Sequence, residues 1–212
     1  MCLRTMYKYP VLSATIWPSN AELVRDCARL NYLHPDWPTF DPTYHKGTWW
    51  KLFRPKHLVC NDWKKGGVDF RDTQYADSLF QAIAYDPPYC AKGGRETSGI
   101  KEMDEAYGMD DAPKTPALLQ AHNDHGLTEM HRICQKNGYV ITKCMDYVSS
   151  GKLWLGTHHT LSHALALGFE CVDRMEHIGT PGPQPKTSPD GTPRRQVHSR
   201  RNLSTLFVLK KK

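Results

Sequence analysis

Four consecutive residues, Asp86-Pro87-Pro88-Tyr89, combine side chains that could do chemistry. They directly follow an apolar run, Ala82 to Tyr85, which predicts a short buried strand. Two prolines cannot continue the hydrogen-bond ladder of a strand, so the chain must turn outward after Asp86. An acid, a rigid turn and an aromatic ring are therefore expected at the carboxyl end of a strand, which is where ligands bind in open α/β sheets.

The chemistry that suits these residues is methyl transfer to an exocyclic amine, which is a weak nucleophile because its lone pair is delocalised into the ring. The Asp86 carboxylate and the Pro87 carbonyl can each accept one N–H, which leaves the lone pair free to face an electrophile. Tyr89 offers a ring on which a base flipped out of a duplex can stack. Taken alone, the four residues also fit a strand followed by an ordinary proline turn.

Acidic residues follow three further short apolar runs. They are Asp41, Asp62 and Asp69. Together with Asp86 they predict a parallel sheet whose ligand edge is lined by acids. After Asp41 comes a tight loop, 42–47, and then an apolar helix start, an arrangement that can cradle a nucleotide-like cofactor. Asp62 lies 21 residues after Asp41, which is the spacing expected of an acid that binds ribose hydroxyls.

Helical and strand patterns fill the rest of the chain. Expected helices span residues 19–30, 115–137 and 160–167. Seven strands are expected. Four of them end near the four acids, and the other three span residues 138–145, 169–173 and 203–209. Expected loops span residues 146–156, 90–115 and 178–202. The pattern indicates one domain, 1–212, with a cofactor half at about residues 15–86 and the two long loops facing the target.

Composition excludes several classes of protein. The chain has 212 residues, and no stretch has the roughly 20 apolar residues that a membrane span needs. The first residues lack the apolar core of a signal peptide, so a cytoplasmic protein without a membrane partner is expected. The seven cysteines form no C-x-x-C pair, which argues against disulfides and zinc. His158, His159 and His163 lack an accompanying acid or cysteine ligand, so no metal is expected.

Positive charge is concentrated at the end of the chain. The net charge is +6, and residues 190–212 hold seven Lys or Arg and one Asp, which is the whole excess. A basic end on a neutral body indicates contact with a polyanion. A solubilising tail is the alternative interpretation for Lys210–Lys212.

The order of these motifs resembles the S-adenosylmethionine-dependent DNA amino-methyltransferases, which methylate adenine N6 or cytosine N4. Asp86–Tyr89 resembles their motif IV, and residues 40–47 resemble motif I, with His45 in place of its usual first glycine. Residues 17–22 stand where motif X would precede motif I, an order similar to the gamma type and to phage-borne enzymes. The resemblance covers most of residues 15–210.

The resemblance implies a Rossmann-like class I methyltransferase fold, an α/β domain with a seven-stranded, mostly parallel sheet, a last antiparallel strand and helices on both faces. It also implies S-adenosyl-L-methionine as cofactor and direct in-line transfer. The residues implied to bind the cofactor are Asp41, Pro42, Thr43, Tyr44, Gly47, Asp62, Asp69 and Phe70. Those implied to act in catalysis are Asp86, Pro87, Pro88 and Tyr89.

DNA is the partner that the resemblance implies, with the target base flipped from the duplex. Basic residues expected to meet its phosphates are Lys92, Arg95, Arg194, Arg195, Arg200 and Arg201. The Asp-Pro-Pro-Tyr sequence favours adenine N6, and cytosine N4 stays open. Two other classes also stay open: the same fold acting on RNA or on a protein amide, and a non-catalytic nucleic-acid-binding accessory protein whose cofactor loop has decayed at His45.

Overall fold

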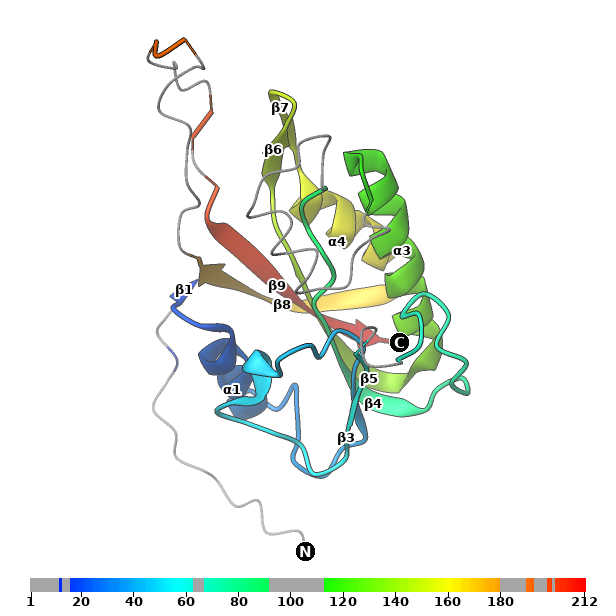
Figure 1. Ribbon diagram of the computed structural model, residues 1–212. Helices are drawn as coiled ribbons and strands as arrows, with labels where there is room; N and C mark the ends of the chain where they lie inside the picture. The colour runs from blue at the N-terminus through cyan, green and yellow to red at the C-terminus, as the bar shows by residue number, and fades with distance from the viewer. Residues whose placement is uncertain are drawn as a thin grey trace, which may run out of the picture.

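The computed structural model describes residues 12, 16–62, 67–91, 113–179, 190–192, 198–199 and 201–212. Their core is a seven-stranded sheet with the order β1-β8-β9-β5-β4-β2-β3 (Figure 1). The strands are β1 (Ile16–Trp17), β2 (Thr39–Asp41), β3 (Leu58–Cys60), β4 (Phe80–Tyr85), β5 (Cys134–Cys144), β8 (Phe169–Ile178) and β9 (Leu203–Lys211). Neighbouring strands are parallel except at β9, which runs antiparallel to both β5 and β8. The expected mostly parallel sheet with an antiparallel last strand is confirmed.

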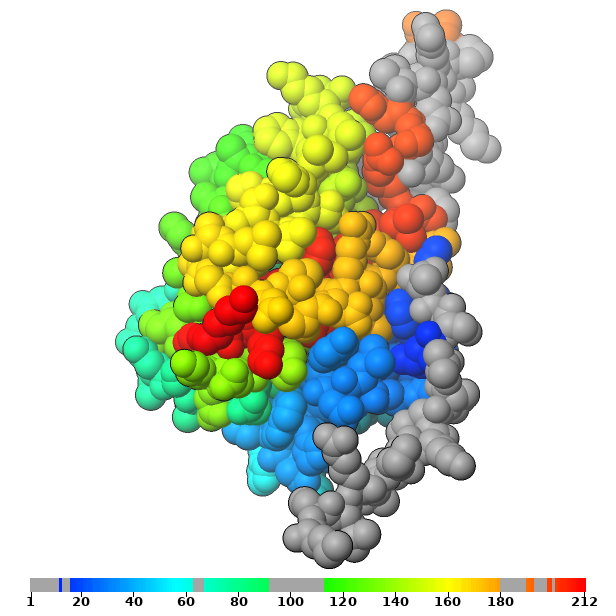
Figure 2. Space-filling view, turned by 180° about the vertical axis from the view of Figure 1, so that it is seen from behind, coloured from blue at the N-terminus to red at the C-terminus, as the bar shows by residue number. Residues whose placement is uncertain are grey.

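Helices cover both faces of the sheet (Figure 1). They are α1 (Asn20–Arg29), the short helix η1 (Thr48–Trp50), α3 (Pro116–Ile133) and α4 (Gly156–Ala166). One buried cluster joins α3 and α4 to one face, and a second joins α1 and η1 to the other. Successive strand residues point to opposite faces, so in β4 Ile83 and Tyr85 pack toward α3 while Ala82 and Ala84 pack toward α1. Figure 2 shows the far side, where β8 lies between α4 and α1.

Helices α1 and α3 begin where their capping residues predict. Ser19 Oγ accepts a hydrogen bond from the Glu22 backbone N–H at 3.3 Å and donates to the Glu22 carboxylate at 2.9 Å, which caps the start of α1. Thr115 Oγ1 accepts from the N–H of Leu118 at 3.3 Å, and Pro116 takes the first helical position. Both helix starts are therefore confirmed.

Two predicted boundaries are wrong. Residues 68–70 form no strand, and the seventh strand of the sheet is β1. The Asn61 side-chain amide donates a hydrogen bond to the Val68 carbonyl and accepts one from the Val68 N–H, so these groups pair with a side chain and not with a neighbouring strand. Helix α3 ends at Ile133 and passes directly into β5, so Asn137 and Gly138 are not its stop. Asn137 does take a left-handed φ of 63°, but inside β5, where the register against β4 shifts.

The segment 146–156, expected as a loop, contains an antiparallel hairpin. Its strands are β6 (Tyr147–Ser149) and β7 (Lys152–Trp154). Ser150 and Gly151 have φ values of 50° and 74°, which suit a two-residue hairpin turn. Helix α4 then begins earlier than expected, at Gly156, because Asp146 Oδ1 accepts hydrogen bonds from the N–H and hydroxyl of Thr157 in its first turn.

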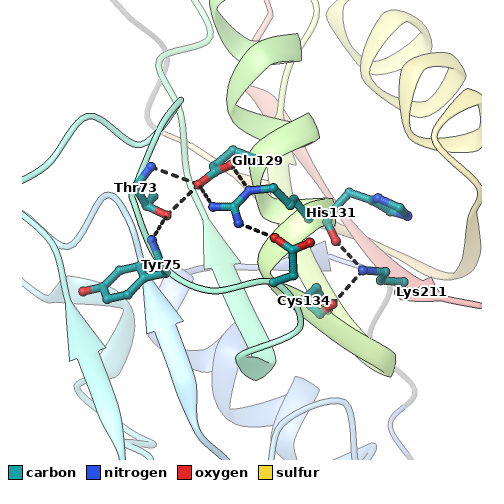
Figure 3. Close-up of polar contacts among 8 residues, drawn as sticks. Thr73, Tyr75, Glu129, His131, Cys134 and Lys211 are labelled. Atoms are coloured by element: carbon teal, nitrogen blue, oxygen red, sulfur yellow. Dashed lines mark hydrogen bonds and ion pairs between the residues drawn. The ribbon is translucent and has the colours of Figure 1, made fainter.

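A polar network fastens the loop before β4 to α3 (Figure 3). Glu129 is 7% exposed, and its carboxylate accepts hydrogen bonds from the Thr73 N–H at 2.9 Å and hydroxyl at 2.6 Å. Arg132 pairs with the same carboxylate at 2.7 Å. The ammonium of Lys211 donates to two carbonyls at the end of the helix, both at 2.8 Å. The network therefore stabilises the edge of the sheet at which β4 and β5 begin.

Candidate active site

Asp86 leaves the end of β4 with one carboxylate oxygen fixed and the other open. Oδ2 accepts a hydrogen bond from Trp49 Nε1 at 3.1 Å, and the Asp86 backbone N–H donates to Thr43 Oγ1 at 3.0 Å. Oδ1 is buried and has no hydrogen-bond partner. Because a buried acceptor without a partner is costly, this oxygen is well placed to receive an N–H from a ligand.

Asp41 lies on the neighbouring strand β2 and has both oxygens engaged. Its Oδ2 accepts from Trp50 Nε1 at 2.7 Å, and its Oδ1 accepts from the Thr43 N–H at 2.9 Å. Thr43 links the two acids, since its backbone binds Asp41 and its hydroxyl accepts from the N–H of Asp86. Asp41 therefore anchors the loop that follows it.

Trp49 and Trp50 are site residues that the sequence reasoning missed. These consecutive residues of η1 are both buried, and they send their indole N–H groups to different acids, Asp86 and Asp41. A buried indole usually finds a hydrogen-bond acceptor. Two consecutive tryptophans, separated from Gly47 by one residue and following the loop after Asp41, were the signal that could have identified them.

Both acids titrate near neutral pH. Burial raises the pKa of Asp41 to about 7, and the negative charge of Asp86 adds to the rise. Burial also raises the pKa of Asp86 to about 6. The positive charge of Lys143 and the side-chain hydrogen bonds of Trp49 and Tyr89 oppose this rise. Above about pH 6 Asp86 is therefore a carboxylate, the form that accepts hydrogen bonds from an amine.

Lys143 on β5 is another residue that the sequence reasoning missed. It is 3% exposed, donates to Asn20 Oδ1 at 2.7 Å and lies 5.6 Å from the ring centre of Tyr89. Asn20 belongs to the segment 17–22, so that segment, β5 and the Asp86 turn meet at one place. A lysine inside an apolar strand was the available signal, because lysine is seldom buried without a partner.

Helix α3 holds the other side of the turn. Asn123 Nδ2 donates to the Pro88 carbonyl at 2.7 Å, while its Oδ1 is buried without a hydrogen-bond partner. The Tyr85 hydroxyl donates to the backbone carbonyl of Asn123 at 3.3 Å. This close approach requires Gly126, because a Cβ there would lie 2.1 Å from the Tyr85 hydroxyl. A second open acceptor thus lies beside the same turn.

The loop from Pro42 to Gly47 contains two left-handed residues. His45 has a φ of 41° and Gly47 a φ of 63°, so the residue that replaces the usual glycine accepts this conformation. Tyr44 lies over Gly47, where a Cβ would be 2.5 Å from the Tyr44 hydroxyl. Asn61 holds the loop, since its side chain donates to the Pro42 carbonyl at 3.1 Å and its backbone carbonyl accepts from Tyr44 at 3.0 Å.

The other predicted cofactor residues have different surroundings. Asp62 is half-buried just beyond the end of β3. Asp69 pairs with Arg71, whose Nη2 lies 2.6 Å from Oδ2, and this pairing lowers the pKa of Asp69. Phe70 packs edge-on against two rings, one on β4 and one on α3, with centres 5.5 Å and 5.0 Å away. Asp69 and Phe70 are therefore already engaged within the protein.

No protein-family model and no curated protein matches the sequence. Solved structures do match it. A proposed methyltransferase from Bacillus halodurans C-125 matches with a TM-score of 0.50 and 12% identity, over 89% of this chain and 98% of that one. The chain has a Rossmann-like methyltransferase fold.

Two DNA methylases also match, with lower TM-scores. One is a proposed DNA modification methylase from Thermus thermophilus, complexed with S-adenosyl-L-methionine, with a TM-score of 0.41 and 15% identity over 68% of this chain and 53% of that one. The other is the cytosine-N4-specific PvuII DNA methyltransferase, with a TM-score of 0.43 and 10% identity over 68% and 48%. The chain spans about half the length of these two proteins.

Of the six residues predicted to contact phosphates, Arg201 lies among the residues that the structure describes. Lys92, Arg95, Arg194, Arg195 and Arg200 lie outside the described residues. Arg201 lines an open pocket of about 260 Å³ with Arg174 and two acids, Asp146 and Glu176. Because β9 runs antiparallel to β5, Arg201 precedes β9 at the edge of the sheet where Asp86 lies, whereas Lys210–Lys212 lie at the opposite edge.

The histidines of α4 link two helices. His159 Nε2 lies 2.9 Å from Asp124 Oδ2, and His163 Nε2 lies 3.2 Å from Thr128 Oγ1, so both contact α3. Among the described residues, no three His, Cys, Asp or Glu side chains come together as metal ligands. None of the helices in this part of the chain has the length and apolar character needed to cross a membrane.

Proposed function

We propose that the chain is an S-adenosyl-L-methionine-dependent methyltransferase that acts on the exocyclic amine of a base in DNA, with adenine N6 as the favoured target. The observation that carries the proposal is Asp86 Oδ1, a buried acceptor without a partner. It lies at the carboxyl end of a central strand in a methyltransferase fold. The resemblance of Asp-Pro-Pro-Tyr to the adenine-N6 enzymes supports the choice of base.

The residues near the site fit the cofactor in part. The Pro42–Gly47 loop would surround its methionine part and Asp62 would bind its ribose, since Asn61 fixes the loop beside the end of β3. Asp69 departs from the resemblance, because Arg71 already occupies its carboxylate. When bound, the cofactor supplies an electrophilic methyl group on a sulfonium, and the C–S electron pair returns to sulfur on transfer.

The residues of the turn would orient the amine and take its surplus proton. Asp86 Oδ1 accepts one N–H and the Pro87 carbonyl accepts the other, which directs the nitrogen lone pair at the methyl group. Once the N–C bond has formed, the nitrogen is positively charged. Asp86 Oδ1 then accepts its surplus proton and passes it to water. Tyr89 would stack on the flipped base.

Basic residues support DNA as the partner. Arg201 lies at the edge of the sheet that carries Asp86, and a duplex bound there would present phosphates to it. The five other predicted contacts belong to the segments 90–115 and 178–202, which connect to the same edge of the sheet. Arginine suits this contact because its planar guanidinium can bind a phosphate through two N–H groups.

Transfer of tritiated methyl groups from labelled cofactor tests the proposal on duplex DNA, single-stranded DNA, RNA and protein. We expect N6-methyladenine in duplex DNA, identified by mass spectrometry of the nucleosides. N4-methylcytosine would keep the enzyme class and change the base, whereas label in RNA or protein alone would contradict the DNA target. Absence of cofactor binding in calorimetry would favour the accessory-protein alternative.

Asp86→Asn is the matched control for this experiment. The amide keeps the size of the side chain but removes the negative charge that accepts the amine proton. We expect methyl transfer to fall by about 100-fold or more. Cofactor affinity should stay within about twofold, because the substitution leaves Asp62 and the Pro42–Gly47 loop intact. Unchanged turnover would contradict the role given to Asp86.

A further inference from the structure

Lys143 has a charged side chain that is buried in the interior of the protein. It lies on β5, with its side chain on the α1 face of the sheet, and it is 3% exposed. Burial lowers its pKa, and the neighbouring Asp86 carboxylate opposes that change. A charge is costly to bury, so the contacts of this ammonium should show what it does.

The neighbours of the ammonium hold it beside the Asp86 turn. Nζ donates to Asn20 Oδ1 at 2.7 Å and lies 5.6 Å from the ring centre of Tyr89. Asn20 carries no charge, so the attraction on Lys143 comes from Asp86. Asp86 Oδ1 nevertheless has no hydrogen-bond partner, so the ammonium does not bond this oxygen.

We propose that Lys143 is a positioning residue for methyl transfer, whose charge keeps Asp86 a carboxylate while Asn20 holds the ammonium away from Oδ1. The proposal rests on the proposed function of Asp86. An ammonium bonded to Oδ1 would block the acceptor that the amine needs. A neutral side chain at this position would let burial convert Asp86 to its neutral form, which cannot accept the proton.

Other titratable groups around the pair do not supply this positive charge. On the β2 side Asp41 is an acid, and each of the two acids disfavours the charge of the other. On the β8 side, burial and the charge of Lys143 lower the pKa of His177, so His177 is neutral at neutral pH. Cys144 and Tyr89 carry no positive charge in any form. Among the described residues, Lys143 is thus the cation that acts on Asp86.

The experiment compares Lys143→Met, which removes the charge, with Lys143→Arg, which keeps it. Lys211→Met is the matched control, because Lys211 is a half-buried lysine of the same sheet that bonds carbonyls at the opposite edge. NMR of isotope-labelled aspartate carboxyls follows the protonation of Asp86, whose signal is the one missing in Asp86→Asn. This measurement needs no turnover. The pH profile of kcat and calorimetric cofactor binding complete the set.

We expect Lys143→Met to move the Asp86 titration and the acidic limb of the kcat profile upward by about one pH unit or more. Lys143→Arg should restore both, and Lys211→Met should leave both unchanged. An unchanged Asp86 titration in Lys143→Met would overturn the proposal, and so would loss of cofactor binding, which would make Lys143 a cofactor contact. If the wild-type protein transfers no methyl group, the proposed function fails, and the NMR result still shows whether the two residues are coupled.

Discussion

At the scale of single residues, two neighbouring acids have different tasks. Trp50 and Thr43 engage both oxygens of Asp41, whereas Trp49 engages one oxygen of Asp86 and leaves Oδ1 open. An acid with both oxygens bonded holds the chain in place. An acid with a buried open oxygen can accept a ligand. The difference comes from Thr43, because each aspartate accepts from one indole and the Thr43 N–H takes the second oxygen of Asp41 alone.

Trp49→Phe tests this assignment. The substitution keeps an aromatic ring but removes the donor to Asp86 Oδ2, so the carboxylate loses its fixed orientation. Loss of one such hydrogen bond costs about 1–2 kcal/mol, which corresponds to about a tenfold lower kcat. Trp50→Phe is the control, because its donor serves Asp41, and it should lower stability more than kcat. Equal losses of kcat in the two variants would show that Trp49 has no special role.

The raised pKa of Asp41 predicts how stability depends on pH. The folded pKa is about 7, whereas an unfolded aspartate has a pKa of about 3.9, so the folded state binds more protons between these values. The contribution of Asp41 to folding is therefore present at low pH and is lost as the pH rises from about 4 to about 7.

Asp41→Asn should remove this contribution. Urea unfolding at pH values from 5 to 8 measures it as the difference in free energy of unfolding between wild type and variant. We expect the wild type to exceed the variant most at the acidic end and the gap to shrink by about 1 kcal/mol or more per pH unit toward neutral pH. Parallel stability curves would mean that Asp41 is ionised throughout.

At the scale of elements, local signals predicted what local interactions determine. The caps at Ser19 and Thr115 contact residues three positions away, and both helix starts were predicted correctly. The end of α3 was not, because Lys211 bonds its last carbonyls from far along the chain. The residues missed at the site, Trp49 and Lys143, likewise contact partners distant in sequence. A single sequence shows no such pairing, so the ends of β2, β3 and β4 were predictable and their side-chain partners were not.

The hydrogen-bond network of Glu129 should stabilise the edge of the sheet opposite Asp86, where β4 and β5 begin. Glu129→Ala leaves the Thr73 N–H and hydroxyl without their acceptor and removes one of the two acids that pair with Arg132, the other being Asp77, so we expect a loss of about 2–3 kcal/mol. Glu129→Gln keeps an acceptor for Thr73 and should lose about 1 kcal/mol. Chemical denaturation measures both. Cofactor affinity is the control, since the network lies away from Asp86, and a large change in affinity would contradict the separation of the two edges.

At the scale of the whole molecule, the antiparallel strand β9 divides the basic end of the sequence. Lys210–Lys212 lie at the edge opposite Asp86, where Lys211 bonds helix carbonyls and Lys212 lies 3.8 Å from Glu170. Arg201, at the other end of β9, lies at the edge that carries Asp86. The charge that looked like one basic tail in the sequence thus lies at two places, and among its described residues Arg201 is the one positioned to meet the proposed DNA target.

Salt dependence of DNA binding tests that division. Arg201→Gln removes one charge at the Asp86 edge, so the slope of log affinity against log salt should fall by about one. Lys56→Gln is the control, because it removes one charge from an exposed lysine that pairs with Asp36 at 2.6 Å, and the net charge of the two variants is equal. Its slope should match the wild type. If both slopes fall together, DNA responds to the net charge of the protein, and a defined binding edge is ruled out.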